Sequence, residues 1–198
     1  MEVFMIKEID LACPECKNHF RTNIYPSINV QMDEGVKNKV LNGELFKFEC
    51  SHCHKIFEVS YPCLYHDMDK KIMIQFALET GKQSEIDIPS DYKFRIVDSY
   101  RSWIEKILIF DSGLDDCYME LYKLLVLSQY EKRENVNGLY YWSVNGTYAL
   151  ALDEKETKTF HYMPFNRDVY DQVVQVFKDD IAQASIVDAA WAIAQTKG

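Results

Sequence analysis

Apolar and polar residues alternate in short runs along the N-terminal part of the chain, which is the pattern of half-buried β-strands. Phe20, Thr22 and Ile24 fall on every second position, so one face of this segment is expected to point into a core. The other predicted strands are 7–12, 45–49, 55–61, 64–66 and 72–78, of which the last two flank a polar turn and form a hairpin. Residues 33–42 interrupt this series with the pattern of a short helix or loop.

The spacing changes to a helical one after a further predicted strand at 92–97. Trp103, Ile104, Ile107 and Leu108 fit one face of a helix, which Ser99 can cap at its start and Gly113 at its end. Asp115 can cap a second helix, whose apolar side is Met119, Tyr122, Leu125 and Val126.

The C-terminal third combines a hairpin signal with two further helices. Asn145-Gly146 stands between two β-rich runs, and a type I′ turn needs positive φ at both of its central positions. Residues 157–163 would add a third strand, and 167–178 and 186–196 have the pattern of amphipathic helices. The short polar segment 81–91, with Gly, Ser and Pro, is the best linker candidate.

These patterns predict an α+β protein of two domains. Residues 1–85 would form a β-rich domain. Residues 86–198 would form an α+β domain with a small antiparallel sheet and about four helices.

Composition and charge narrow the function classes. The chain has 198 residues, of which 47% are hydrophobic, so it can bury a sizeable core and is not a disordered composition. Its net charge is −9, and both predicted domains are acidic, which disfavours a nucleic-acid partner because binding to phosphates needs converging Lys and Arg side chains. The start MEVFMIKEID is not a signal peptide, and the longest apolar run, AAWAIA, is too short to span a membrane. The protein is therefore expected to be cytoplasmic, where thiols stay reduced.

Two Cys-x-x-Cys pairs, Cys13/Cys16 and Cys50/Cys53, are the strongest chemical signal in the sequence. Two such knuckles in a reducing compartment, brought together by the strands between them, are typical of a zinc ribbon. A site closed by four cysteines leaves no position for water, so it is expected to be structural. Iron is the alternative metal, because a tetrahedron of thiolates suits it too. His52 and His54 are alternative ligands, but either would leave a nearby thiol unused.

The CPEC knuckle, the segment NGELFKFECSHC and the following YPCLYHDMDKKIMI resemble the bacterial CpXC family. The resemblance covers roughly residues 10–80, and IEKILIFDSGLDD (104–116) resembles the region that follows the motif in that family. It implies a zinc-binding protein whose four family cysteines are Cys13, Cys16, Cys50 and Cys53. It implies no reaction.

Other candidate residues have simpler interpretations. Cys63, His66 and Asp67 could pair a nucleophile with a base, but positions i and i+3 of a strand point to opposite faces. Cys117 is interpreted as a buried helix cysteine, because the neighbouring carboxylates disfavour a thiolate. The acids Asp111, Asp115, Asp116 and Glu120 are interpreted as water-facing residues around a helix N-terminus, rather than as a catalytic or calcium site.

Three functions remain open. The first is a non-enzymatic zinc-binding adaptor for a protein partner or a second copy, and no small-molecule substrate is indicated. Most members of a dense aromatic set are expected to lie in the core, and the rest could form a contact surface: Tyr140, Tyr141, Trp142, Tyr148, Phe160, Tyr162 and Phe165. The second is an enzyme with an unidentified site at the domain junction. The third is a nucleic-acid-binding zinc ribbon, which the charge opposes.

Overall fold

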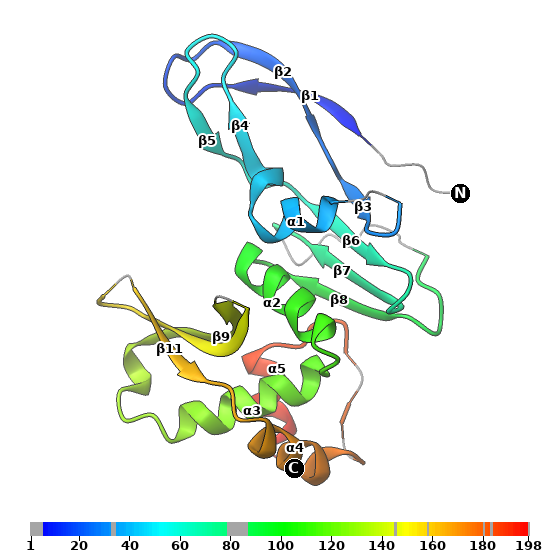
Figure 1. Cartoon of the computed structure of the whole chain (residues 1–198), viewed down its shortest axis with the longest axis vertical. Coiled ribbons are helices and arrows are strands. Elements are labelled where there is room, and N and C mark those ends of the chain that lie inside the picture. The colour runs from blue at the N-terminus through cyan, green and yellow to red at the C-terminus, as the bar shows by residue number, and fades with distance from the viewer. Residues whose placement is uncertain are drawn as a thin grey trace. The chain divides into compact units, whose positions relative to one another are not determined.

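The computed structural model (Figure 1) describes residues 6–32, 35–78, 87–144, 146–157, 159–179, 181–182 and 184–197. The chain divides into two compact units, Met1–Tyr100 and Arg101–Gly198. No described helix combines the length and the apolar character that a membrane span requires.

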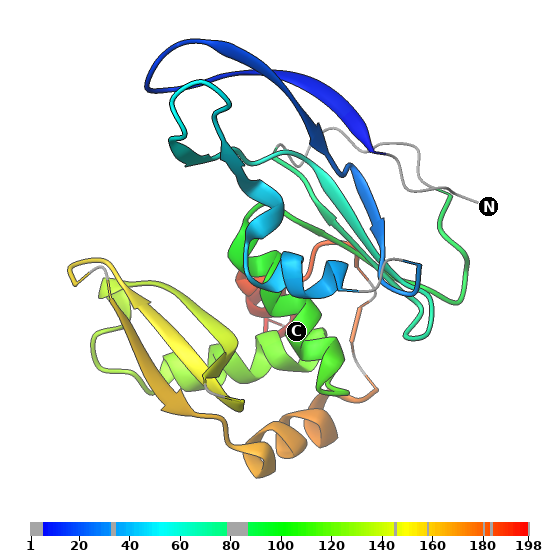
Figure 2. The same ribbon diagram turned by 45° about the horizontal axis from the view of Figure 1, so that its top comes forward.

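The first unit carries two separate antiparallel hairpins. Strands β1 (Lys7–Ala12) and β2 (His19–Ile24) form one of them, and β4 (Lys47–Glu49) and β5 (Ile56–Glu58) form the other. The turns of both hairpins lie side by side at the same end of the unit in Figures 1 and 2. The predicted alternation of β2 is confirmed, because Phe20 and Thr22 are half-buried, Ile24 is buried, and the strand residues between them are exposed.

A four-stranded mixed sheet forms the rest of this unit, in the order β3-β6-β7-β8. Its strands are β3 (Ser27–Asn29), β6 (Cys63–Asp67), β7 (Ile72–Phe76) and β8 (Lys93–Val97). The predicted hairpin is the antiparallel pair β6–β7, whereas β3 and β8 join the sheet by parallel pairing. Helix α1 (Val36–Leu41) and the 3-10 helix η1 (Glu44–Phe46) precede β4, and Phe46 packs edge-on against Tyr61, Phe76 and Tyr100.

Two helices with well-defined ends open the second unit. Helix α2 (Tyr100–Asp111) ends in a Schellman motif at Gly113 (φ 66°), where the N–H groups of Gly113 and Leu114 donate to the carbonyls of Phe110 and Ile109. The carboxylate of Asp115 then accepts from the Cys117 N–H at 2.9 Å and caps α3 (Asp116–Ser128). Both helix boundaries therefore form where Gly113 and Asp115 predict them.

A three-stranded antiparallel sheet of order β11-β10-β9 follows the 3-10 helix η2 (Arg133–Asn135). Its strands are β9 (Val136–Val144), β10 (Thr147–Glu154) and β11 (Phe160–Pro164). Val144 pairs with Thr147, so the predicted hairpin is present, although Asn145 lies outside the described residues. Helices α4 (Arg167–Phe177) and α5 (Ala189–Gln195) pack with α3 around a core that includes Met119, Tyr122, Tyr141, Leu150 and Leu152.

The predicted α+β class is confirmed, with β-hairpins that carry the cysteines in the first unit and a small antiparallel sheet with helices in the second. The predicted boundary at residue 85 falls within 79–86, which lie outside the described residues, as does most of the predicted linker 81–91. Strand β8 pairs with β7 and belongs to the first unit. The independence of the two units stays a prediction.

Candidate metal centre

The two Cys-x-x-Cys segments fold into the same turn. In the first, the N–H of Cys13 donates to the carbonyl of Asn18 at 3.0 Å, and the N–H of Lys17 donates back to the carbonyl of Cys13 at 3.0 Å. In the second, Cys50 N–H donates to Lys55 O at 3.0 Å and His54 N–H to Cys50 O at 2.9 Å. Each turn connects the strands of a hairpin, β1–β2 or β4–β5, and carries two of the four cysteines.

Both turns require a left-handed residue directly after the second cysteine. Lys17 (φ 61°) and His54 (φ 59°) occupy these positions, although glycine adopts this conformation without strain. A side chain there costs about 1–2 kcal/mol. Two matching strained positions in two short hairpins indicate that something else in the site holds the turns in this form.

The four sulfur atoms form one compact group. Cys13 Sγ lies 3.7 Å from Cys53 Sγ, and Cys16 Sγ lies 3.7 Å from Cys50 Sγ. All four sulfur atoms lie within 4.8 Å of one another. The edge of a tetrahedron with metal–sulfur bonds of about 2.3 Å is about 3.8 Å, so the spacing matches a four-thiolate metal site. The cysteines are free, since a disulfide would bring two sulfur atoms to about 2.05 Å.

The electrostatics of the cluster call for a cation. The N–H of Cys16 lowers the pKa of Cys13 to about 7, against the opposing effect of burial. The N–H of Lys55 lowers the pKa of Cys53, but burial and the three neighbouring thiols outweigh it and raise the pKa to about 12. Four thiolates this close repel one another, so full deprotonation needs a positive ion between them.

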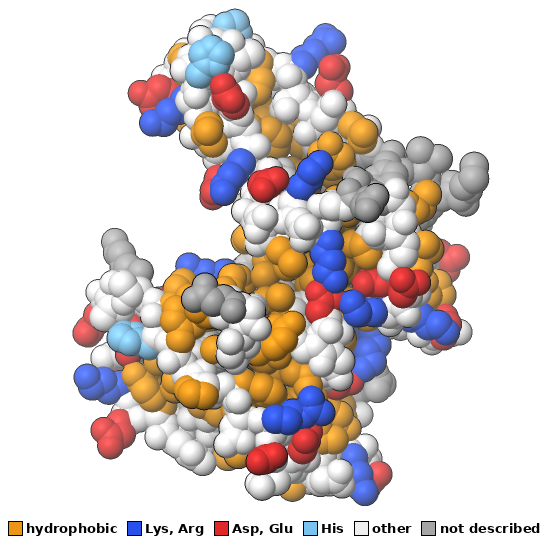
Figure 3. Space-filling model, in the orientation of Figure 1, with side chains coloured by type: hydrophobic (Ala, Val, Ile, Leu, Met, Phe, Trp, Pro, Cys, Tyr) orange, Lys and Arg blue, Asp and Glu red, His pale blue; other side chains and the backbone are white. Residues whose placement is uncertain are grey.

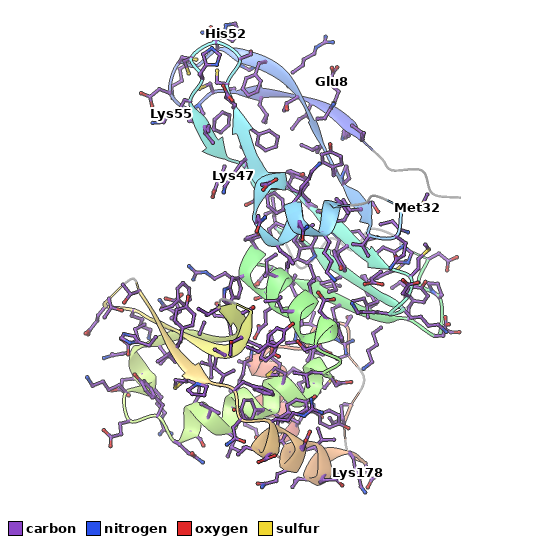
Figure 4. All side chains as sticks on the ribbon, in the orientation of Figure 1. Glu8, Met32, Lys47, His52, Lys55 and Lys178 are labelled. Carbon is purple, nitrogen blue, oxygen red and sulfur yellow. The ribbon has the colours of Figure 1, made fainter. Side chains whose placement is uncertain are left out.

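Polar groups donate hydrogen bonds to two of the sulfur atoms, and the imidazole of His54 binds a carboxylate instead of the cluster. The N–H of His52 donates to Cys50 Sγ at 3.4 Å, and the side-chain amide of Asn18 donates to Cys16 Sγ at 3.6 Å. His54 Nδ1 contacts Glu49 Oε1 at 2.8 Å, and the His52 side chain is exposed at the tip of the second knuckle, where Figure 4 labels it beside Lys55. Among the described residues, the ligand group at this tip therefore consists of the four cysteines alone.

The acidic group around the start of α3 differs from the prediction. Asp115 caps the helix as expected, but Asp116 and Glu120 are 0% and 4% exposed and do not face water. Lys106 Nζ lies 3.1 Å from Asp116 and 3.2 Å from Glu120, so these acids are paired with a buried ammonium group. A second buried lysine, Lys123, lies 2.8 Å from Glu105 and 2.9 Å from Glu120.

Sequence reasoning missed this buried ion network because it treated the charges as parts of solvent-facing helix ends. The signal that could have found it is the presence of Glu105 and Lys106 between the apolar pairs Trp103-Ile104 and Ile107-Leu108 of α2, together with Glu120 and Lys123 at a spacing of i, i+3 in α3. The carboxylates Asp115 and Asp116 and the thiol of Cys117 also lie within 4.8 Å of one another. Helix capping and the pairing with Lys106 account for the two acids, and Cys117 is buried as predicted.

No nucleophile–base pair forms among Cys63, His66 and Asp67. The Cys63 thiol is buried and donates to the carbonyl of Tyr25 at 3.0 Å, and its burial raises its pKa far above the usual range. Asp67 Oδ1 instead accepts from the side-chain amide of Gln31 at 2.7 Å.

Comparison with known proteins identifies a family but no individual relative. Searches of curated proteins and of solved structures found no match. The family model described as CpXC protein matches residues 11–123, which is more than half of the 198-residue chain and includes both knuckles, α2 and the first part of α3. The chain therefore belongs to the CpXC family.

Proposed function

We propose that this CpXC protein binds one zinc ion through Cys13, Cys16, Cys50 and Cys53, and that the ion has a structural role. The observation that carries this proposal is the sulfur spacing of 3.7 Å between the two knuckles, which fits the edge of a zinc–thiolate tetrahedron. Four protein ligands leave no open position at which the ion could activate water. Structural stabilisation is then the role that remains for it.

The second hairpin itself supports a structural role, because of the six residues in its two strands only Phe48 is buried. Strands β4 and β5 have three residues each, and Ile56 and Glu58 of β5 are exposed. Short strands with few buried side chains supply little hydrophobic stabilisation. A metal that joins the two knuckles would supply the stabilisation that this small core lacks, because metal binding in small ribbon domains contributes directly to the free energy of folding.

The test is elemental analysis of protein purified without chelators. The expected result is about one zinc per chain, with loss of metal in Cys13→Ser and in Cys50→Ser. The matched controls are Cys63→Ala and Cys117→Ala, which also remove a buried thiol but lie outside the cluster. Iron in place of zinc would keep the site and change the metal. Metal-free wild-type protein would overturn the proposal.

We also propose that the protein acts as a binding module for another protein in a reducing, cytoplasmic compartment, and not as an enzyme. A closed four-cysteine site supports this, because it offers no coordination position for a substrate. The free thiols of all six cysteines fit a reducing compartment.

Nucleic acid is not expected to be the partner. The cations near the knuckles are Lys17, Arg21, Lys47 and Lys55, of which Arg21 lies 3.3 Å from Glu8, and the loaded site would itself carry a charge of about −2. Binding through phosphate contacts needs more converging cations than this. Fluorescence anisotropy with mixed-sequence DNA and RNA at about 150 mM salt is expected to show no submicromolar binding. Tight binding that weakens as salt rises would instead favour a nucleic-acid-binding ribbon.

A further inference from the structure

The sheet of the second unit has two apolar faces, and only one of them is used by the core. Leu139, Tyr141, Leu150 and Leu152 alternate on the face that packs against α3 and α4. The opposite face lines a hollow together with Arg101, and Figure 3 shows hydrophobic side chains gathered over this sheet. The residues of this hollow, which we call the aromatic slot, are Arg101, Tyr140, Trp142, Ala151, Phe160 and Tyr162.

The strand register explains the shape of the aromatic slot. Ala151 of the central strand pairs with Tyr140 of β9 on one side and with Tyr162 of β11 on the other. Neighbouring strands lie about 4.8 Å apart, so the two tyrosines rise as walls about 10 Å apart over an alanine floor. Gly138 makes room for one wall, because a Cβ at this position would lie 2.7 Å from Tyr140 Oη.

The size of the aromatic slot restricts what can enter it. Its volume is about 120 Å³. Cofactor and drug-sized ligands occupy pockets of roughly 300–1,000 Å³, whereas an apolar cavity of about 150 Å³ holds a single benzene ring. The aromatic slot therefore fits one ring-sized group, of the size that a protein partner inserts as a side chain.

The polar groups that line the aromatic slot can all donate hydrogen bonds. Within the described part of the chain, the hydroxyls of Tyr140 and Tyr162 and the indole N–H of Trp142 have no hydrogen-bond partner. Burial raises the pKa of Tyr140, so its hydroxyl keeps its proton. The guanidinium of Arg101 lies 4.7 Å from the centre of the Phe160 ring and donates to Asp153 Oδ2 at 2.6 Å, which leaves further N–H groups available.

A proline-rich segment has the complementary chemistry. Proline supplies a rigid apolar ring and a carbonyl acceptor but no N–H donor. In the polyproline II conformation all carbonyls point to the surroundings, and aromatic-lined grooves recognise such segments at a low cost in entropy. The charged side chain among the lining residues is Arg101, and it is already paired with Asp153. A segment without charged side chains therefore fits the aromatic slot best.

We propose that the aromatic slot binds a proline of an uncharged, proline-rich partner segment. The proposal rests on the protein-interaction part of the proposed function and gives that interaction a site and a partner chemistry. It does not depend on the identity of the metal.

The test uses the full chain and a labelled hexaproline peptide with capped ends, in a fluorescence-anisotropy titration. Saturable binding is expected, and a peptide with alanine in place of proline should bind at least about tenfold more weakly. Tyr162→Ala removes one wall and should weaken binding about tenfold. Trp142→Phe keeps an apolar ring but removes the donor, so a loss of about two- to tenfold is expected.

Tyr148→Ala is the matched control. Tyr148 is 39% exposed against 51% for Tyr162 and belongs to the same sheet, but its ring stacks on Tyr141 of the opposite face. Its removal should leave binding unchanged. No saturable binding up to about 1 mM peptide, or an equal loss in Tyr148→Ala and Tyr162→Ala, would overturn the proposal. Capture of protein partners from a lysate by the wild-type chain and by Tyr162→Ala separates the two failures. Equal capture by both, with no peptide binding, rejects the slot and leaves the protein-interaction role standing.

Discussion

The Sγ atom of Cys13 lies 3.7 Å from the Sγ atom of Cys53, a residue 40 positions away in the other hairpin. The remaining pair, Cys16 and Cys50, makes the same 3.7 Å approach across the hairpins. Each knuckle therefore supplies half of a tetrahedron and depends on the other to complete it. A metal bound here would join the two hairpins in addition to the edge-to-face contact between Phe20 and Phe57, which has direct consequences for stability.

Removal of the metal should open the hairpins and leave the second unit folded. With a chelator, the N–H groups of Cys13 and Cys50, which close the two turns, should exchange with solvent at least about a hundredfold faster. A ligand present at about a hundred times its Kd stabilises the folded state by about this factor, and chelation removes that stabilisation. The N–H of Tyr141, which donates to Glu105 at 2.7 Å inside the second unit, should keep its protection. Hydrogen exchange followed by mass spectrometry measures both. Equal loss at Tyr141 would show that the two units unfold together.

The reactivity of the thiols should separate the four cluster cysteines from the other two. In the native protein, chelation should make four thiols reactive towards a disulfide reagent, while Cys63 and Cys117 stay unreactive until the protein unfolds. The reason is that both are buried, and burial raises the pKa of Cys63 so that little thiolate forms. A colorimetric thiol titration with and without chelator measures the number of reactive thiols in each state. Reaction of Cys63 at the rate of the cluster would contradict this account.

Lys106→Met should destabilise the second unit by about 3–5 kcal/mol, because it leaves the buried carboxylates of Asp116 and Glu120 without this ammonium group. Burial alone would lower the pKa of Lys106, but these two acids outweigh it and raise the pKa, so the charged form is present in the folded protein. Urea denaturation measures the free energy of unfolding.

Arg167→Met is the control for this substitution. Arg167 pairs with Asp171 at 2.9 Å, but both side chains are exposed, so its loss should cost no more than about 0.5 kcal/mol. If both variants lost a similar amount of free energy of unfolding, the buried ion network would contribute no more to stability than a surface ion pair.

The features that could be predicted from the sequence are those with local signals. Gly113 and Asp115 mark the boundary between α2 and α3, and the spacing of the four cysteines predicts the cluster. The parallel pairing of β8 with β7 has no local signal, because register between distant strands is decided by the packing of the sheet. The burial of Asp116 and Glu120 was missed for the same reason, since it depends on lysines that only the folded helices bring near.

X-ray absorption at the metal edge of the purified full chain tests the central claim most directly, because it measures the ligand atoms around the ion. Coordination by Cys13, Cys16, Cys50 and Cys53 predicts a first shell of four sulfur atoms at about 2.3 Å around zinc. A shell that requires nitrogen or oxygen at about 2.0–2.2 Å, or protein without bound metal, would contradict the four-cysteine site.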